Sequence, residues 1–596
     1  MSLASLFEPT GFASWQDSVV SRELLHKVAH RSGFAISPLH EDAYLLGLRS
    51  SYAVAKQVEL LPDYIDPRLE IVPTFGGPRQ YSKPEPNSNG LSAWCHVFSL
   101  RATVPETRLL ENRSIALKDT IAVGCIPQTL GTLPSFVSGK SEYQCSQIDA
   151  TIVRRLLLAG ATLTGTTTCE NYSFSPMSYT SMSGPVHNPW QQGFNSGGSS
   201  SGSAALVALK VARAAGAKNL EGSGPDVELA IGGDQAGSIR VPASYCGIYG
   251  LKPTYGLVPY TGIAGLLPMI DHAGPLATNL EDIALLLTVL AGYDGLDERM
   301  NPESPLRDNV KQYHDELASF ATQTARSKHC SARSGTVEPP LRVGLIIEGF
   351  QLPGMSEEVA ETVRAAAMEH FTAQGAEVSE VSIPIHSLGA AIWTAAVRNQ
   401  MASHAFGGRA TDSLTHDLPH LTPIWPPNQE MYDVLSRHNP AVILTMLGET
   451  MLEDVIPLSA QRKAHRHVLE LRAAYDDALG RFDVLITPTT PTVAPPLPDI
   501  EDSSSGAADP TSPSTVEKML RLAVGSTNNT SPFNASGHPA LSVPCGWATS
   551  THGGYKLPVG MQIIGRRFDD LGVLKAAKLF DLGGGKLGVR PTGACT

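Results

Sequence analysis

Cysteine is scarce in this sequence, with 8 cysteines among 596 residues and no two of them in a C-x-x-C pair. Sparse, unpaired cysteines are typical of reduced thiols, so we expect a cytoplasmic protein rather than a secreted, disulfide-linked one. Long apolar runs are also missing. Stretches such as 283–291 are much shorter than the ~20 residues that span a bilayer, so no membrane association is predicted. The amino end shows no signal-peptide pattern.

Positively charged residues are in deficit, because the chain has 45 Lys+Arg and 57 Asp+Glu, which give a net charge of −12. Such a chain neutralises little phosphate, which excludes a general nucleic-acid binder. Metal-binding histidine spacing is lacking too. His26 and His30 are four residues apart, but Lys27 stands where an H-E-x-x-H motif requires Glu. We therefore predict no metal and no other cofactor.

The sequence does contain ample material for a core, since 42% of it is hydrophobic and 17% charged. Residues 1–85 show two short helical patterns and are predicted to form a small helical domain, with a Pro- and Gly-rich linker at 73–90. After this linker, helices and short apolar strands alternate. This order predicts an α/β fold with a large, mainly parallel sheet covered by helices on both faces.

Helix and loop signals refine this prediction. Asp149 is expected to cap the helix that follows it, and Asn279 to cap a helix over 280–291. Two segments, 326–340 and 499–515, are polar and low in complexity, so we expect them to be surface loops.

A cluster of glycines and serines, GFNSGGSSSGSAAL, occupies residues 193–206 and precedes an apolar helix. Glycines let the backbone turn tightly, and free N–H groups at a helix N-terminus favour negative charge. A flexible linker is disfavoured because linkers join polar boundaries. The stretch 198–202 also fits the G-x-S-x-G nucleophile elbow of α/β-hydrolases. That motif needs an apolar strand before it, whereas 186–196 is polar.

A second glycine-rich turn lies in AIGGDQAGSIRVP at 230–242. Its backbone N–H groups could converge on one oxygen, as an oxyanion hole requires. A βα turn that binds phosphate remains an alternative. Asp234 and Arg240 flank the turn and could brace it by a bidentate ion pair. The N–H groups of the predicted hole belong to Gln235, Ala236, Gly237 and Ser238.

Lys118 ends an apolar strand pattern over 114–118. Burying an ammonium group is costly and lowers its pKa, which would make this lysine a usable base. From this segment alone, a lysine paired with an acid at a strand edge is the favoured interpretation.

Taken together, these three segments resemble the amidase signature family, whose members cleave amides with a Ser–cis-Ser–Lys triad. The Lys-Asp-Thr segment, the Gly-Gly-Ser-Ser loop, Gly-Ser-Ile-Arg-Val-Pro and Gly-Leu-Lys-Pro-Thr all match in order. The resemblance spans 91–580 and is strongest to bacterial aliphatic and aromatic amidases with an N-terminal helical domain. It implies a catalytic domain over 86–590, with a motif core at 110–295 and a substrate-pocket subdomain at about 350–480.

The resemblance also implies roles for single residues. Ser238 matches the nucleophile, Ser199 the middle serine, which follows a cis peptide, and Lys118 the base. The implied reaction is hydrolysis of a carboxamide C–N bond to a carboxylic acid and ammonia through a Ser238 acyl-enzyme. Phe174, Ile270 and Trp393 match apolar positions of the substrate pocket, although ordinary core positions explain them equally well.

Three features depart from the family pattern. Ala236 and Ser201 stand where glycine is common, and the interval between Ser199 and Ser238 carries an apparent insertion at 210–226. A surface insertion of this kind costs little loop-closure entropy, so the site is expected to survive.

Two other activities remain open. A carbamate presents the same carbonyl to Ser238, so a urethanase is the main alternative. The glutamine-hydrolysing subunit of tRNA-dependent amidotransferases shares these motifs and is the less favoured one. Because residues 1–85 are too few to build a large core, we also expect a homodimer or higher homo-oligomer through them, with packing on the catalytic domain as the alternative.

Overall fold

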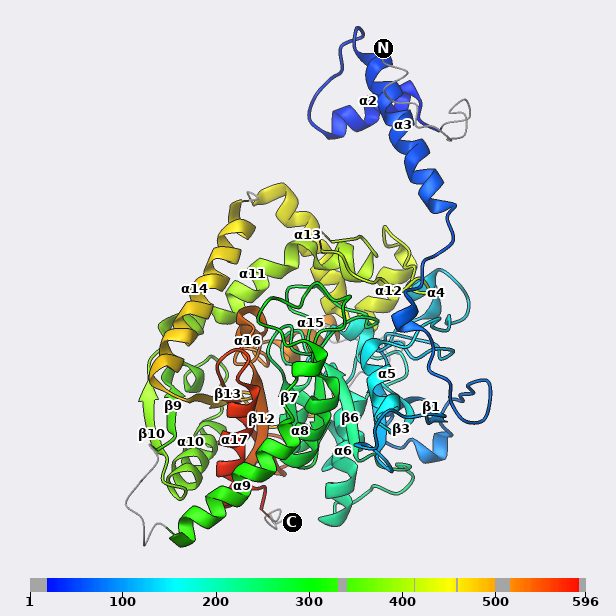
Figure 1. Cartoon of the computed structure of the whole chain (residues 1–596). Helices are drawn as coiled ribbons and strands as arrows, with labels where there is room; N and C mark the ends of the chain where they lie inside the picture. Colours follow the sequence, from blue (N-terminus) through cyan, green and yellow to red (C-terminus); the bar gives the residue numbers. More distant parts are fainter. Residues whose placement is uncertain (1–18, 331–339, 412, 457–458, 499–514, 589–596) are drawn as a thin grey trace, which may run out of the picture. The chain divides into compact units, whose positions relative to one another are not determined.

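The computed structural model describes residues 19–330, 340–411, 413–456, 459–498 and 515–588. The chain divides into two compact units, Met1–Asp66 and Pro67–Thr596 (Figure 1). This division falls earlier in the chain than the boundary expected near residue 85. The expected loop at 499–515 lies almost wholly outside the described residues. The expected loop at 326–340 is contradicted at its beginning, where 326–330 belong to helix α9 (Tyr313–Cys330), and 331–339 lie outside the described residues.

The described part of the smaller unit, from residue 19 on, contains the helices α2 (Arg22–Arg31) and α3 (Glu41–Glu59), which confirm the helical patterns of the sequence. Ser21 caps α2, because its hydroxyl accepts a hydrogen bond from the Leu24 N–H at 3.1 Å. Among the described residues of this unit, Val20, Leu25 and Leu45 form a small buried cluster, with Ile36 and Tyr52 packed against it.

A mixed sheet of 11 strands forms the centre of the larger unit, in the order β1-β3-β2-β6-β8-β7-β12-β13-β11-β9-β10. Strands β4 and β5 form a separate pair. The strands are β1 (Trp94–Leu100), β2 (Ser114–Lys118), β3 (Thr162–Thr167), β4 (His187–Asn188), β5 (Gln191–Asn195), β6 (Leu229–Gly233), β7 (Tyr249–Lys252), β8 (Ala273–Ala277), β9 (Arg342–Ile346), β10 (Glu377–Val381), β11 (Val484–Pro488), β12 (Ala540–Thr549) and β13 (Lys556–Ile564).

The α/β class and the mixed sheet are confirmed, but the share of parallel pairs is smaller than expected. In the described sheet, β3–β2, β2–β6, β11–β9 and β9–β10 are parallel. The centre is antiparallel, because β7, β8, β12 and β13 pair there in alternating directions. Sequence alternation of helices and strands could not reveal this, since β12 and β13 follow each other without a helix.

Helices pack around the large sheet (Figure 1). Among them, α7 and α10 contact β12. The α-helices of the larger unit are α4 (Pro134–Ser138), α5 (Thr151–Leu158), α6 (Ser201–Ala214), α7 (Arg240–Cys246), α8 (Leu280–Leu290), α9 (Tyr313–Cys330), α10 (Glu357–Thr372), α11 (Gly389–Met401), α12 (Gln429–His438), α13 (Pro440–Val455), α14 (Ser459–Arg481), α15 (Thr515–Ala523), α16 (Ser531–Ser536) and α17 (Asp570–Phe580). None of the helices in the described ranges is long and apolar enough to cross a bilayer.

The two predicted helix caps differ in outcome. Asn279 caps α8, because its side chain accepts a hydrogen bond from the Asp282 N–H at 2.9 Å. The prediction for Asp149 is wrong, since α5 has Ala150 at its N-cap. The Asp149 carboxylate instead forms a buried ion pair with Arg79, at 2.6 Å to Oδ1 and 2.7 Å to Oδ2.

That ion pair also corrects the interpretation of 73–90 as a linker. Thr74 and Ser82 form backbone bridges with Ala102 and Val97, so this segment pairs with the beginning of the sheet. Its prolines and glycines shape a segment that packs on the larger unit rather than a spacer.

Candidate active site

Lys118 is the last residue of β2, and its side chain is completely buried. Its ammonium nitrogen, Nζ, donates a hydrogen bond to the Ser199 hydroxyl at 2.8 Å. Burial lowers the pKa of Lys118 to about 8, although the nearby Cys169, Asp234 and Glu170 oppose this shift. No carboxylate of the described residues lies within ion-pair distance of Nζ, so the interpretation as a lysine paired with an acid does not hold.

Ser199 is also completely buried and lies in the glycine-rich loop just before α6. The peptide bond between Gly198 and Ser199 is cis, as the resemblance implied. The loop is fixed from both sides, because the Ser199 carbonyl accepts from the Glu170 N–H at 3.3 Å and the Ser200 N–H donates to the Ser238 carbonyl at 3.2 Å. These contacts bring Ser199 and Ser238 into one site.

Ser173 is a further hydroxyl at this site that the sequence analysis missed. It ends the short 3-10 helix η4 (Asn171–Ser173), with a positive φ of 60°. Its Oγ lies 3.0 Å from the Ser199 Oγ, so the two hydroxyls share a hydrogen bond. Nothing in the local sequence marks this serine, because the contact depends on how η4 folds against the loop before α6.

Ser238 lies in the turn between β6 and α7 and is 8% exposed. Its hydroxyl makes no hydrogen bond within the described part of the chain. The preceding Gly237 has φ +140°, and a Cβ there would meet the Thr530 hydroxyl at 2.4 Å, so only glycine fits. The tight turn thus leaves the Ser238 side chain available.

Two carbonyls of this turn are anchored from outside it. The Gln235 carbonyl accepts from the Trp393 indole N–H at 3.0 Å, and the Ala236 carbonyl accepts from the Thr530 hydroxyl at 2.6 Å. The N–H groups of residues 235–238 donate no hydrogen bond within the described ranges. Fixed carbonyls with free N–H groups between them are what an oxyanion hole needs.

Below the turn, Arg240 and Asp234 form the predicted bidentate ion pair, at 3.0 and 2.9 Å. Arg240 also donates to the Thr530 carbonyl, the Gln562 side chain and the Asn534 side chain. Burial opposes ionisation of Asp234, but the charge and hydrogen bonds of Arg240 lower its pKa below the usual range. Both side chains are fully buried, and the pair braces the turn.

The departure at Ser201 has a local explanation. The Ser201 hydroxyl donates to Glu170 Oε1 at 2.7 Å, and Thr180 donates its N–H and hydroxyl to Oε2. Burial raises the pKa of Glu170 to about 7, although these hydrogen bonds oppose the shift. Ser201 is therefore explained at this position by the hydrogen bond that it donates to the buried carboxyl group of Glu170.

The three predicted pocket residues lie in one apolar cluster. Ile270 and Trp393 belong to its buried part, and Phe174 and Ala236 pack against it. The cluster therefore touches the turn that carries Ser238.

A separate cavity of about 150 Å³ lies near the end of β2, and Thr120, two residues beyond Lys118, is one of the residues that line it. Tyr260 lines it, and its hydroxyl accepts from the Gln235 side chain at 2.8 Å. Charged side chains such as Arg299 and Arg409 line other parts of it. None of the three predicted pocket residues does.

Comparison with known proteins then decides the family. The family model Amidase matches residues 99–574. The chain belongs to the amidase signature family. An enantioselective amidase of Rhodococcus rhodochrous is 36% identical over 524 residues, which cover 87% of this chain and 88% of that protein. As a member of this family, the chain is a hydrolase that acts on amides.

Other relatives have different roles. A glutamyl-tRNA(Gln) amidotransferase subunit of Methanosarcina acetivorans is 30% identical over 488 residues, covering 78% of this chain and 83% of the relative. The crystal structure of a bacterial aryl acylamidase of the amidase signature family aligns with a TM-score of 0.57 and 23% identity, over 81% of this chain and 84% of that one. This structural likeness confirms the fold.

Proposed function

We propose that this protein is a free-standing amidase that hydrolyses carboxamides to carboxylic acids and ammonia through an acyl-enzyme on Ser238. The observation that carries the proposal is the hydrogen bond from Lys118 Nζ to Ser199 Oγ, next to a turn that presents Ser238 with unpaired N–H groups. The buried amine of Lys118, the buried hydroxyl of Ser199 and the free hydroxyl of Ser238 are the three groups that a proton path to a nucleophile requires.

The proposed reaction begins with neutral Lys118. It takes a proton from Ser199 as Ser199 takes one from Ser238, and the Ser238 oxygen bonds to the substrate carbonyl carbon. This step requires the Ser238 hydroxyl, which is free in the structure, to turn toward Ser199. The same path returns the proton to the leaving nitrogen, so the C–N bond breaks with loss of ammonia. Water then attacks the acyl-enzyme and releases the acid.

The N–H groups of residues 235–238 are proposed to bind the carbonyl oxygen as it gains negative charge. Trp393 and Thr530 hold the neighbouring carbonyls, so the donors need no reorganisation during the reaction. Ala236 replaces a glycine without blocking this role, because a methyl group leaves its N–H free. The chemistry uses no cofactor.

The acyl side of the substrate is proposed to lie against Phe174, Ile270 and Trp393. An apolar cluster next to the nucleophile favours hydrophobic acyl groups. The cluster does not distinguish an amide from a carbamate, because both present a carbonyl with a similar substituent.

A substrate panel tests the proposal. The purified full-length protein would be assayed for ammonia release from short aliphatic amides, aryl amides and ethyl carbamate, with Ser238→Ala as the control. We expect kcat/KM to be highest for amides with an apolar acyl group. A higher kcat/KM for the carbamate would favour a urethanase. Activity only on glutamine, and only with partner proteins present, would favour the amidotransferase role.

We also propose a homo-oligomer that forms through residues 1–85. The smaller unit leaves Phe34, Leu39, Leu60 and Tyr64 exposed, with 59, 92, 85 and 74% of their surfaces accessible. Burying such a set against a second copy would stabilise a unit whose own core is small. Light scattering should give at least twice the monomer mass of 63.3 kDa, and a monomer at micromolar concentration would contradict this.

A further inference from the structure

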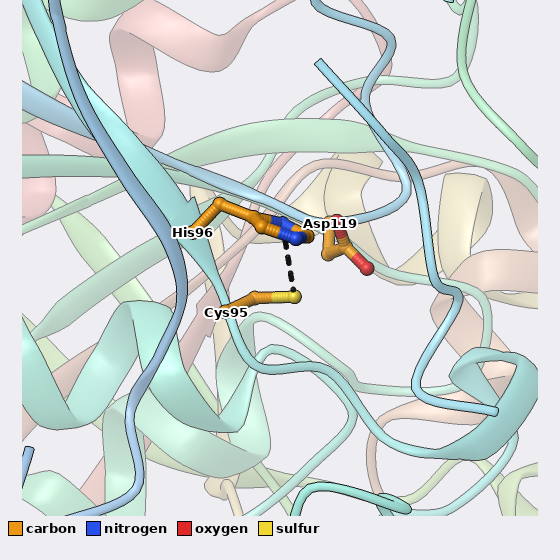
Figure 2. A group of neighbouring side chains, drawn as sticks. All are labelled: Cys95, His96 and Asp119. Carbon is orange, nitrogen blue, oxygen red and sulfur yellow. Dashed lines mark hydrogen bonds between the residues drawn. The ribbon is translucent and has the colours of Figure 1, made fainter. Parts of the chain in front are cut away.

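Three side chains that the proposed reaction does not use meet beside the end of β2. Cys95 and His96 are neighbours on strand β1, and Asp119 follows Lys118 (Figure 2). The Cys95 Sγ lies 3.4 Å from the His96 Nδ1, and one ligand atom from each of the three residues lies within 4.8 Å of the others. A thiol, an imidazole and a carboxylate therefore converge on a small volume.

The Asp119 carboxylate supplies a second, independent observation. Its side chain is completely buried. Its Oδ2 accepts two hydrogen bonds from Thr129, from the N–H at 2.9 Å and from the hydroxyl. Its Oδ1 has no hydrogen-bond partner among the described residues. Buried carboxylate oxygens are normally satisfied, and the nearby Cys95 thiol is the group that interacts with this carboxyl when no ion is bound.

We propose that Cys95, His96 and Asp119 bind a thiophilic divalent cation, for which Zn²⁺ is the best match. Nitrogen, sulfur and oxygen ligands in one group fit zinc, whereas magnesium and calcium prefer oxygen alone. The Thr129 hydroxyl, 3.7 Å from the Cys95 Sγ, or a water would complete four ligands.

Charge balance favours the same ion. A dication bound by one thiolate, one carboxylate and a neutral imidazole gives a site with no net charge, which burial tolerates. Binding releases the proton of the Cys95 thiol to solvent, together with that of Asp119 when it is protonated.

The position of the cluster suggests a structural ion. Asp119 lies in the turn just after β2 and its carboxylate accepts from Thr129, whereas Lys118 at the strand end donates to Ser199. An ion here would link β1, at one edge of the sheet, to the end of β2, with β3 between them. The ion would therefore stabilise the segment that holds Lys118 and take no part in acyl transfer.

Metal binding by the whole protein tests this directly. The full-length chain would be stripped with a chelator, dialysed against Zn²⁺ or Co²⁺, and its metal content measured per chain. We expect one ion per chain, a thiolate-to-metal charge-transfer band with Co²⁺, and a higher Tm with Zn²⁺ than without it.

Variants locate the ion. Cys95→Ser should abolish the charge-transfer band, and His96→Gln should weaken Zn²⁺ binding at least ~10-fold. Cys125→Ser, which removes an exposed thiol elsewhere in the same unit, is the matched control and should bind like the wild type. Circular dichroism would confirm that each variant is folded. The absence of saturable binding, or an unchanged Co²⁺ band in folded Cys95→Ser, would overturn the proposal.

Discussion

Two buried cations near Ser238 are held in opposite ways. Arg240 donates five hydrogen bonds, two of them to the Asp234 carboxylate, whereas Lys118 donates one, to a neutral hydroxyl. Both side chains are completely buried. A paired guanidinium keeps its charge permanently, while an unpaired ammonium in the same surroundings loses it easily.

This difference suits Arg240 to a structural role and Lys118 to the role of a general base. Lys252 shows that burial alone does not make a base. It is fully buried with a pKa well below the usual range, yet it donates to the Pro253 and His538 carbonyls at 3.0 and 2.6 Å. Carbonyl oxygens carry no proton that Lys252 could take. The distinguishing feature of Lys118 is therefore its hydroxyl partner, Ser199.

The largest effect is expected when Lys118 is made as permanently charged as Arg240. Lys118→Arg should lower kcat by ~10²–10⁴-fold, because a guanidinium does not deprotonate and cannot act as a general base. Steady-state kinetics on an amide would measure this, with Lys118→Ala as the control for lost volume. Near-normal turnover by folded Lys118→Arg would mean that Lys118 is an electrostatic brace like Arg240.

Breaking the brace should change stability first. Arg240→Gln leaves the Asp234 carboxylate buried without a counter-charge, and we expect a loss of about 3–5 kcal/mol in the free energy of unfolding. Urea denaturation would measure it. The double variant Asp234→Asn, Arg240→Gln should lose less than the single one, because no charge is left unpaired. Equal losses for the two would contradict this account of the pair.

Ser173 should matter less, because it acts on Ser199 rather than on substrate. Ser173→Ala removes one hydrogen bond from the Ser199 hydroxyl, and we expect kcat to fall about 10-fold with KM unchanged. Ser175→Ala is a matched control, since that hydroxyl bonds only within its own turn, to Met177. If both variants lose the same activity, the loss reflects the loop and not the contact with Ser199.

A change of similar size is expected in the pH dependence. The neutral form of Lys118 is the base, and its pKa is lowered to about 8, so kcat should rise with pH through this value. Between pH 7 and pH 9 we expect an increase of about 10-fold. This rise of kcat with pH should be absent in Lys118→Ala. A flat profile in the wild type would indicate that no group with this pKa gains activity on deprotonation.

The sequence predicted features whose signals are local. Asn279 at a helix start and the Asp234–Arg240 pair across one turn need only a few neighbouring residues, and both are confirmed. Asp149 looked equally local, but its partner Arg79 lies 70 residues earlier, in a segment whose prolines and glycines resembled a linker. The local helix signals could not show that the Asp149 carboxylate forms an ion pair with Arg79 and does not cap the helix.

The same distinction between local signals and distant contacts applies to the residues of the candidate site. Lys118, Ser199 and Ser238 could be proposed from the sequence because each lies in a distinctive motif, and the structure places the first two in hydrogen-bond contact. Ser173, Glu170 and Thr530 were missed, since each contributes one side chain from an unremarkable segment. The antiparallel centre of the sheet was missed for a similar reason, because strand direction depends on pairing between distant segments.

The central claim is that Ser238, and no other serine of the two loops, becomes acylated. A fluorophosphonate probe should label the wild-type protein, and mass spectrometry should place the adduct on Ser238. Ser238→Ala should be neither labelled nor active. An adduct on Ser200, together with retained activity of Ser238→Ala, would contradict the account and move the nucleophile to the glycine-rich loop before α6.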